Sequence, residues 1–398
     1  MKPLRIYSCL IVEEDSNLWH QQFTRTLRTM GHRVFVPPPI GLRSSWARLH
    51  AGLWREPDAQ TITGRILEDV GRVASREGTD VFFCYLYPFQ FVPELLKSLT
   101  RRGIPCVYFF CDNFSHPELA NDYAPHATLN WVPEKEALPF FQASGSRAVH
   151  LPMAANPEIY RPVAVEETPS VTFVGTKNPY RRERIGRLLT AGIPVRVFGD
   201  GWNSKNASYH SLEARINGAS GRRSLADRIR AYAWWKKSAL IRFTNHGIAP
   251  WVRSRRYAAL GREFEALTSD AAGTDVLDRE ALNRRYSESA VSLGINDQFI
   301  PERTENDGIA IYSKLRDFEA TMAGACYLTQ RTPENAEHFE DGQEIMTYAT
   351  PEELVEKARF LLANETFRKR LRKAGHRRAL AEHTWSHRFE KILSLLKP

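Results

Sequence analysis

Residues 171–201 read VTFVGTKNPYRRERIGRLLTAGIPVRVFGDG, and this stretch indicates the fold of the chain. It opens with the apolar run VTFVG, continues through the helical segment RRERIGRLLTAG, and ends with the apolar run IPVRVFGDG. Two short apolar runs separated by a helical segment are typical of a strand–helix–strand unit with parallel strands.

The same alternation continues on both sides of this unit. Before it, nearly all-apolar runs at 4–12, 80–87 and 104–112 predict strands that are covered on both faces. After it, the runs VSLGIN, ACYLTQ and EIMTYA alternate with helical segments. The polar, proline-bearing stretch NPEIYRPVAVEETPS at 156–170 interrupts the pattern and predicts a linker.

The sequence therefore predicts an α/β fold with two doubly wound domains, at 1–160 and 170–383, and a terminal helix at 384–398. Ligands of such sheets bind at the carboxyl ends of the strands, so we expect them between the two domains.

Composition excludes several classes of protein. The 398 residues are 42% hydrophobic and 25% charged, which excludes a disordered chain or a coiled coil. The five cysteines form no CxxC pair, so a disulfide framework or a zinc ribbon is not expected. The apolar run at 4–12 is too short to span a bilayer and is followed by acidic residues. We expect a cytoplasmic protein, at most peripheral on the inner face of the membrane.

The positive charge is concentrated in one segment. Residues 205–262 hold thirteen Lys and Arg against two acids, a net +11, so the net +9 of the chain leaves −2 for the rest. Within this insert, a capping box of Ser224 with Asp227 opens an amphipathic basic helix that carries tryptophans. Residues 224–256 could bind an anionic membrane surface or an anionic glycan or lipid-linked acceptor. Alternatively, they pack on the second domain with a solvated basic face. Nucleic acid is the least favoured partner, because no nucleic-acid motif accompanies the charge.

Two motifs in the second half carry phosphate-type chemistry. In SKLRDFEATMAGACYLT (313–329), a loop leads into a helix whose first turn holds Arg316, with Glu319 three residues later. Helix N-termini and arginine bind phosphate, and a carboxylate can accept hydrogen bonds from two ribose hydroxyls. The alternative is a capped helix with a surface Arg and Glu.

The second motif is FVGTKNPYRRERIG (173–186), where a strand ends at Gly175 and four cations gather at the start of the next helix: Lys177, Arg181, Arg182 and Arg184. Cations oppose the dipole at this end of a helix, and a bound diphosphate would resolve the conflict. The alternative is a solvated charged face.

Seven stretches resemble the CgeB-type, or spore-maturation-protein-like, glycosyltransferases. They are VTFVG (171–175), LRDFEATMAGACYLT (315–329), TPENAEHFEDGQEI (332–345), YATPEELVEKARFLLAN (348–364), AGHRRALAEHTWSHRFEKIL (374–393), RRGIPCVYFFCDN (101–113) and SGSRAVHLPMAANPEIYRP (144–162). The resemblance implies the GT-B fold: two Rossmann-like domains, an interdomain cleft, and a last helix that packs back on the first domain. It also implies sugar transfer from a nucleotide-sugar, most readily a UDP- or GDP-sugar, with no cofactor or metal and with retention, as in the related family-4 transferases.

The resemblance also assigns residues. Arg316 with Lys177 or Arg181 would hold the diphosphate, and Glu319 the ribose. The segment from Gly199 to Trp202 would lie near the nucleobase. The implied donor-binding set is Gly175, Thr176, Gly199, Trp202, Leu315, Arg316 and Glu319. Family-4 transferases carry a second acid eight residues before the ribose-binding Glu, where this chain has Ile311. That contact with the donor sugar is therefore missing or supplied elsewhere.

The proposed catalytic set is Lys177, Arg181, Arg316, Asp112 and His116. The three cations would stabilise the charge on the departing nucleoside diphosphate without a metal. On the acceptor side, loop 13–17 and residues 112–116 would line the first domain, and Asp112 or His116 would accept the proton of the acceptor hydroxyl. Alternatively, Asp112 caps the next helix and His116 lies in a turn before Pro117.

Two other functions fit the same fold. One is a catalytically inactive nucleotide-sugar-binding protein, for which Ile311 is the best support. The other is a GT-B sugar-nucleotide epimerase, which would not need an acceptor-binding or membrane-facing insert.

Overall fold

The computed structural model describes residues 2–13, 17–42, 56–115, 119–202, 247–273 and 277–396. The chain separates into two compact units. Unit 1 holds the described residues up to 152 together with 385–396, and unit 2 holds those from 153 to 384. The division falls a few residues before the linker predicted at 156–170.

Unit 1 is built on a six-stranded parallel sheet in the order β2-β1-β3-β4-β5-β6. Its strands are β1 (Arg5–Leu10), β2 (Arg33–Phe35), β3 (Val81–Tyr85), β4 (Cys106–Phe109), β5 (Leu129–Val132) and β6 (Ala148–His150). Every residue of β3, β4 and β5 is buried, as expected for central strands covered on both faces. The strands predicted at 4–12, 80–87 and 104–112 are thus confirmed.

Helices and short helical turns connect these strands. They are η1 (His20–Thr24), α1 (Arg25–Thr29), α3 (Glu56–Glu77), α4 (Glu94–Arg101), η2 (Asn113–Ser115), η3 (Leu119–Tyr123), η4 (Ala124–His126), η5 (Lys135–Ala137) and α5 (Leu138–Ala143). The η1 segment is a π-helix that leads directly into α1, so this helical segment contains one wide turn.

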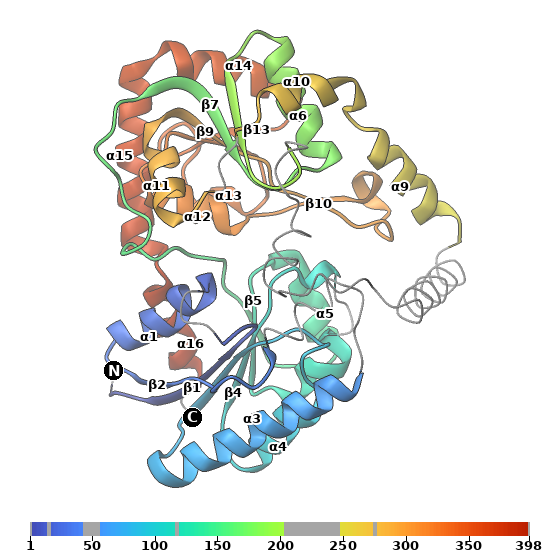
Figure 1. The fold of residues 1–398 in the computed structure, drawn as a ribbon, viewed down its shortest axis with the longest axis vertical. Coiled ribbons are helices and arrows are strands. Elements are labelled where there is room, and N and C mark those ends of the chain that lie inside the picture. The colour runs from blue at the N-terminus through green and yellow to red at the C-terminus, as the bar shows by residue number, and fades with distance from the viewer. Residues whose placement is uncertain are drawn as a thin grey trace, which may run out of the picture. The chain divides into compact units, whose positions relative to one another are not determined.

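The last helix, α16 (Trp385–Leu395), packs into unit 1 and lies beside α1 (Figure 1). The Trp385 ring centroid is 4.7 Å from that of Phe23, in an edge-to-face arrangement. The Arg388 Nε donates to the Pro152 carbonyl at 2.9 Å, and the Arg147 guanidinium donates to the Leu395 carbonyl at 2.7 Å. The prediction that the terminal helix packs on the first domain is therefore confirmed.

Unit 2 is built on a five-stranded parallel sheet in the order β13-β12-β9-β7-β8. Its strands are β7 (Thr168–Val174), β8 (Val195–Phe198), β9 (Ser289–Gly294), β12 (Tyr327–Gln330) and β13 (Met346–Tyr348). A separate antiparallel hairpin, β10 (Asp297–Phe299) and β11 (Ile309–Ile311), follows β9 directly.

The helices of unit 2 include two packed pairs, α6 (Pro179–Thr190) with α14 (Pro351–Ala363) and α12 (Leu315–Met322) with α15 (Glu365–Glu382). The others are α9 (Ala249–Ala259), η6 (Arg262–Phe264), α10 (Glu265–Asp270), α11 (Arg279–Glu288), η7 (Glu305–Gly308) and α13 (Asn335–His338). In both units the first and third strands along the chain are neighbours in the sheet. Ligands of such sheets bind where these two strands end, which in unit 2 is the edge formed by β7 and β9.

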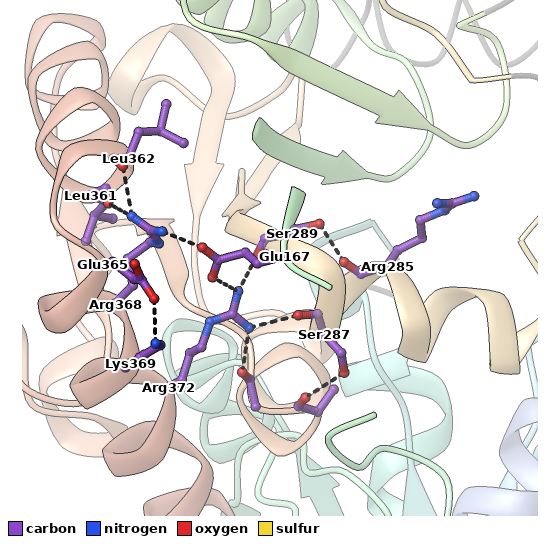
Figure 2. A network of polar contacts seen from close by, with 12 residues as sticks. Glu167, Arg285, Ser287, Ser289, Leu361, Leu362, Glu365, Arg368, Lys369 and Arg372 are labelled. Carbon is purple, nitrogen blue, oxygen red and sulfur yellow. Dashed lines mark hydrogen bonds and ion pairs between the residues drawn. The ribbon is translucent and has the colours of Figure 1, made fainter. Parts of the chain in front are cut away.

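A partly buried ion-pair network joins the residue that precedes β7, Glu167, to later helices of unit 2 (Figure 2). The Glu167 carboxylate pairs with the guanidinium groups of Arg368 and Arg372. Arg372 also donates to the carbonyls of Ser287 and Gly324, at 3.2 and 3.0 Å, near the carboxyl ends of α11 and α12. Cations at these helix ends satisfy free carbonyls and complement the dipole, so the network ties three segments together.

No helix in the described part of the chain is both long and apolar enough to cross a membrane.

Candidate functional site

The two phosphate-type motifs of the sequence meet at the carboxyl end of β7. Gly175 follows the strand, and a Cβ placed on it would lie 2.9 Å from an Arg316 guanidinium nitrogen. The Gly175 N–H donates to the Phe198 carbonyl at 2.8 Å, and its carbonyl accepts from the Trp202 indole at 2.6 Å. The bare Cα of Gly175 therefore gives Arg316 its place against the strand end.

Arg316 is the cation in this group that forms no ion pair with a carboxylate of the described residues, although the buried Glu319 carboxylate acts on it electrostatically. It lies in the first turn of α12, and its Nε donates to the Tyr286 hydroxyl at 3.2 Å. It makes no ion pair with any described residue. A free guanidinium next to the positive end of a helix dipole is an arrangement that binds phosphate.

Glu319 lies one turn further along α12 and is 4% exposed. Its Oε1 accepts a hydrogen bond from the Tyr160 hydroxyl at 2.6 Å. Burial raises the pKa of Glu319, while the bond from Tyr160 and the charge of Arg316 oppose that rise. One carboxylate oxygen is thus already taken by Tyr160, a residue of the linker that the sequence gave no reason to select.

The cations at the start of α6 have carboxylate partners, which differs from the conflict expected from the sequence. The Lys177 ammonium pairs with Glu265, and the Arg182 guanidinium pairs with the same carboxylate at 2.7 Å. Arg184 pairs with Glu183 at 2.7 Å. Because Glu265 comes from α10, folding itself brings a carboxylate to this positive end of α6, where it offsets the charge of the cations.

Arg181 is held by a buried acid. Its Nε lies 3.0 Å from the Asp297 Oδ1, and Asp297 is 4% exposed as a whole residue. The other oxygen of Asp297 accepts from the Asn178 amide at 2.8 Å and from the Tyr257 hydroxyl at 3.3 Å. Asn178 is also the N-cap of α6, since its side chain accepts from the Arg181 backbone N–H. The Asp297 carboxylate therefore fixes the entry to α6.

Asp297 was missed by sequence reasoning, although its position directly after a buried strand was a signal for it. In the β10–β11 hairpin Asp297 is the cross-strand partner of Ile311, the position where family-4 transferases carry an acid. A carboxylate therefore lies next to that position, but both of its oxygens have protein partners.

The Gly199–Trp202 segment packs on the same strand end. Gly199 has a φ of 125°, and a Cβ on it would lie 2.4 Å from the Gly175 carbonyl oxygen, so only glycine fits. Trp202 is 1% exposed and packs edge-to-face on Phe173. The indole thus packs against the strand end and holds the Gly175 carbonyl. That Trp202 lies near a nucleobase stays a prediction.

Two further residues of the expected donor set lie beside this group. The Thr176 carbonyl accepts from the Arg181 guanidinium at 2.9 Å. Leu315 is the first residue of α12 and is half-buried.

In unit 1, Asp112 follows β4 with a strained backbone. Its φ of 65° lies in the left-handed region that non-glycine residues rarely adopt. Its N–H donates to Glu134 Oε1 at 2.6 Å, and the Asn113 amide also donates to Glu134. The carboxylate of Asp112 has no partner among the described residues. As far as residues 2–13, 17–42, 56–115 and 119–202 show, Asp112 caps no helix, and its half-buried carboxylate has no partner there.

Glu13, at the end of β1, is held by backbone donors. Its Oε1 accepts from the N–H groups of Ile40, Gly41 and Leu42, at 3.0, 2.7 and 2.7 Å. Residues 14–16 of the predicted acceptor-side loop lie outside the described residues, as does His116. The same holds for 203–246, which includes the helix predicted from Ser224 and most of segment 224–256.

Several solved structures share this architecture. A sucrose-phosphate synthase from Thermosynechococcus elongatus matches with a TM-score of 0.58 and 12% identity over 99% of both chains. HepE from Anabaena, in complex with UDP and glucose, matches with a TM-score of 0.57 and 10% identity over 99% of this chain and 100% of its own. A glycosyltransferase from Rickettsia africae matches with a TM-score of 0.56 and 10% identity over 99% and 98%. The fold is therefore the GT-B fold of glycosyltransferases.

A family model described as glycosyl transferase-like matches residues 181–394, more than half of the chain. The chain belongs to this glycosyl transferase-like family, and the resemblance to CgeB-type transferases is confirmed. No curated protein sequence matches the chain.

Proposed function

We propose that the protein transfers a sugar from a nucleoside-diphosphate sugar to a hydroxyl of a glycan, lipid-linked or protein acceptor. Unit 2 binds the donor. The observation that carries this proposal is Arg316, a guanidinium at the N-terminus of α12 against Gly175 that forms no ion pair within the described part of the chain. The solved structures of HepE contain UDP with glucose, or UDP-glucose, which supports a UDP-sugar as the first donor to test.

In this reaction the bond between the sugar C1 and the phosphate oxygen breaks, and a bond from C1 to the acceptor oxygen forms. Negative charge develops on the departing diphosphate, and Arg316 stabilises it without a divalent cation. A charge-assisted hydrogen bond of this kind contributes about 1.5–3 kcal/mol. For transfer with retention, the acceptor oxygen attacks C1 on the face that the diphosphate leaves, and the proton of its hydroxyl passes to the Asp112 carboxylate of unit 1.

Lys177 is the better candidate for a second phosphate ligand than Arg181. The side chain of its partner Glu265 is 52% exposed and keeps Arg182 as a second cation, so Lys177 can leave it at little cost. The side chain of Asp297, by contrast, is 1% exposed, and removing Arg181 from it would leave a buried carboxylate with one fewer partner. Arg181 therefore keeps Asp297 and shapes the loop. Glu319 binds the ribose through the oxygen that Tyr160 does not occupy.

The first experiment is a thermal-shift screen of nucleotide-sugars, because a ligand that binds the folded state raises the unfolding temperature. Donors that bind are then tested for sugar transfer, and the anomeric proton coupling of the product reports retention or inversion. A protein that binds no nucleotide-sugar, or binds one without transferring its sugar to any acceptor, would contradict the proposed function.

The site is tested by Arg316→Ala. We expect its kcat/KM to fall about ten- to a hundredfold, because about 1.4 kcal/mol corresponds to tenfold. The matched control is Arg377→Ala on α15, an exposed arginine without a partner in the described part of the chain, which should not change turnover. Wild-type turnover in Arg316→Ala would remove this role.

A further inference from the structure

The α9 helix is fixed to the donor unit by its inner face. The Tyr257 ring stacks on the Phe299 ring of β10 with centroids 4.0 Å apart and planes at 6°. The Tyr257 hydroxyl donates to Asp297, and the Arg253 Nε donates to the Pro301 carbonyl at 2.7 Å. These contacts attach α9 to the β10–β11 hairpin, beside which Figure 1 draws it.

The outer face of α9 exposes apolar side chains that the fold does not cover. Ile248 is 62% exposed and Trp251 is 55% exposed, and these are the two largest exposures of large hydrophobic side chains in the described chain. They lie one helical turn apart. The Arg255 guanidinium lies 4.4 Å from the Trp251 ring centroid and extends the same face.

The outer face of α9 also carries positive charge. Arg255 and Arg256 are exposed there, while Arg253 belongs to the inner face and the acids Glu263 and Glu265 lie beyond the end of α9. Arg256 reaches Asp307 at 3.8 Å with both side chains largely exposed, a weak pair, and Arg255 has no carboxylate partner among the described residues. An exposed tryptophan and isoleucine flanked by arginines suit the boundary between lipid headgroups and acyl chains, where rings and arginine stems are buried and guanidinium groups meet anionic headgroups.

We propose that this outer face, Ile248, Trp251 and Arg255, binds the surface of an anionic lipid bilayer. The face belongs to the same unit as Arg316, so lipid binding holds the donor unit at the membrane surface, where a lipid-linked acceptor would be met. This inference goes beyond the proposed function, and its tests need no turnover.

The first test is flotation of the full chain with phosphatidylcholine vesicles, with or without phosphatidylglycerol. We expect binding that requires phosphatidylglycerol and weakens with salt. Arg255→Glu should weaken it roughly thirtyfold, since each basic residue at such a surface contributes about 1 kcal/mol and the change spans two charges. Ile248→Ser with Trp251→Ser should weaken it about tenfold or more.

The matched control is Phe140→Ser in unit 1, which removes a side chain of similar exposure (53%) from another surface and should bind vesicles as the wild type does. Wild-type protein that fails to float with anionic vesicles at low salt would overturn the proposal. So would an Ile248→Ser, Trp251→Ser protein that floats as well as the wild type. Binding to a soluble acidic polysaccharide without flotation would reassign the face to a glycan.

A second test reads the depth of this helix directly. All five native cysteines are buried, so a cysteine introduced by Ala258→Cys on the outer face is selectively labelled with an environment-sensitive fluorophore. We expect its emission to shift to the blue with anionic vesicles. The same label at Ala363→Cys, an exposed position on α14, should not shift. Equal responses at both positions would contradict binding through α9.

Discussion

At the carboxyl edge of each sheet a buried glutamate holds a loop, but the charged side chain beside that loop is acidic in unit 1 and basic in unit 2. In each unit a glutamate directly after a proline, 3% exposed, follows a strand of the sheet and accepts a backbone N–H from a loop. In unit 1 that loop follows β4, the neighbour of β5, whereas in unit 2 it follows β11 of the separate hairpin. Glu134 holds Asp112 at 2.6 Å, and Glu334 holds Ser313 at 2.8 Å. Within the described residues, Asp112 at the edge of unit 1 has a carboxylate without a partner, and Arg316 in unit 2 has a guanidinium that forms no ion pair. The proposed function assigns the first to the proton of the acceptor and the second to the diphosphate.

The largest expected effect tests the acceptor side of this comparison. Asp112→Asn should lower kcat about a hundredfold or more, because a positioned general base contributes about 10²–10⁴-fold. The KM for the donor should stay close to the wild-type value, because Asp112 lies in unit 1 and the donor is proposed to bind to unit 2. The control is Asp122→Asn, an exposed aspartate of the same unit. An Asp112→Asn enzyme with the wild-type kcat would contradict this role.

The next effect concerns the packing of Gly199 on Gly175, which has no counterpart in the described part of unit 1. Gly199→Ala should lower the free energy of unfolding by about 1–3 kcal/mol and weaken donor binding, because its Cβ meets a backbone carbonyl at a positive φ. Gly31→Ala is the matched control: Gly31 also has a positive φ, of 85°, but a Cβ there meets nothing within 4 Å. Denaturant unfolding of both proteins separates backbone strain from the clash. Equal losses would assign the whole effect to φ.

The two buried glutamates allow a direct test of the shared scaffold. Glu134→Gln and Glu334→Gln should each cost about 1–3 kcal/mol of stability, because an amide offers only one acceptor oxygen to buried donors. Their exposed neighbours, in Glu136→Gln and Glu337→Gln, should have little effect. Thermal unfolding measures all four. If only one of the two variants, Glu134→Gln or Glu334→Gln, lost stability, the two glutamates would have similar geometry but would not contribute equally to stability.

The smallest expected effect is on stability as a function of pH, and it has opposite signs for the carboxylates of Glu319 and Asp80. Burial raises the pKa of Glu319 in unit 2, so ionising it at neutral pH opposes folding, and this cost disappears as the pH falls below its unfolded pKa. Glu319→Gln should therefore raise the unfolding temperature at neutral pH and lose that advantage in acid. In unit 1 the hydrogen bond from Arg5 lowers the pKa of Asp80, so Asp80→Asn should have the opposite sign at neutral pH and the same convergence in acid. Parallel shifts of both variants would contradict these assignments.

Local patterns were sufficient for the α/β fold. Apolar runs separated by helical segments predicted the alternation of strands and helices, and the structure brings Gly175 and Arg316, two residues of the expected donor set, close to each other. That they form the donor site stays a prediction. The partners of the cations were not predictable in this way. Glu265 lies 88 residues after Lys177, and Asp297 lies 116 residues after Arg181, so no local spacing relates them. Tyr160 and Glu319 are 159 residues apart and meet only in the folded unit.

The hydrogen bond from the Tyr257 hydroxyl connects the two proposed ligand-binding surfaces of unit 2, which are the outer face of α9 and the nucleotide site. Tyr257 belongs to α9 and donates to Asp297, which in turn fixes Arg181 at the start of α6. A lipid surface bound to α9 and a nucleotide bound near Arg181 would therefore both act on the Asp297 carboxylate. Linkage is reciprocal: if vesicles tighten donor binding by some factor, the donor must tighten vesicle binding by the same factor. That factor can be measured from donor binding with and without vesicles, or from vesicle binding with and without donor. Its value would state how strongly membrane binding and donor binding depend on each other.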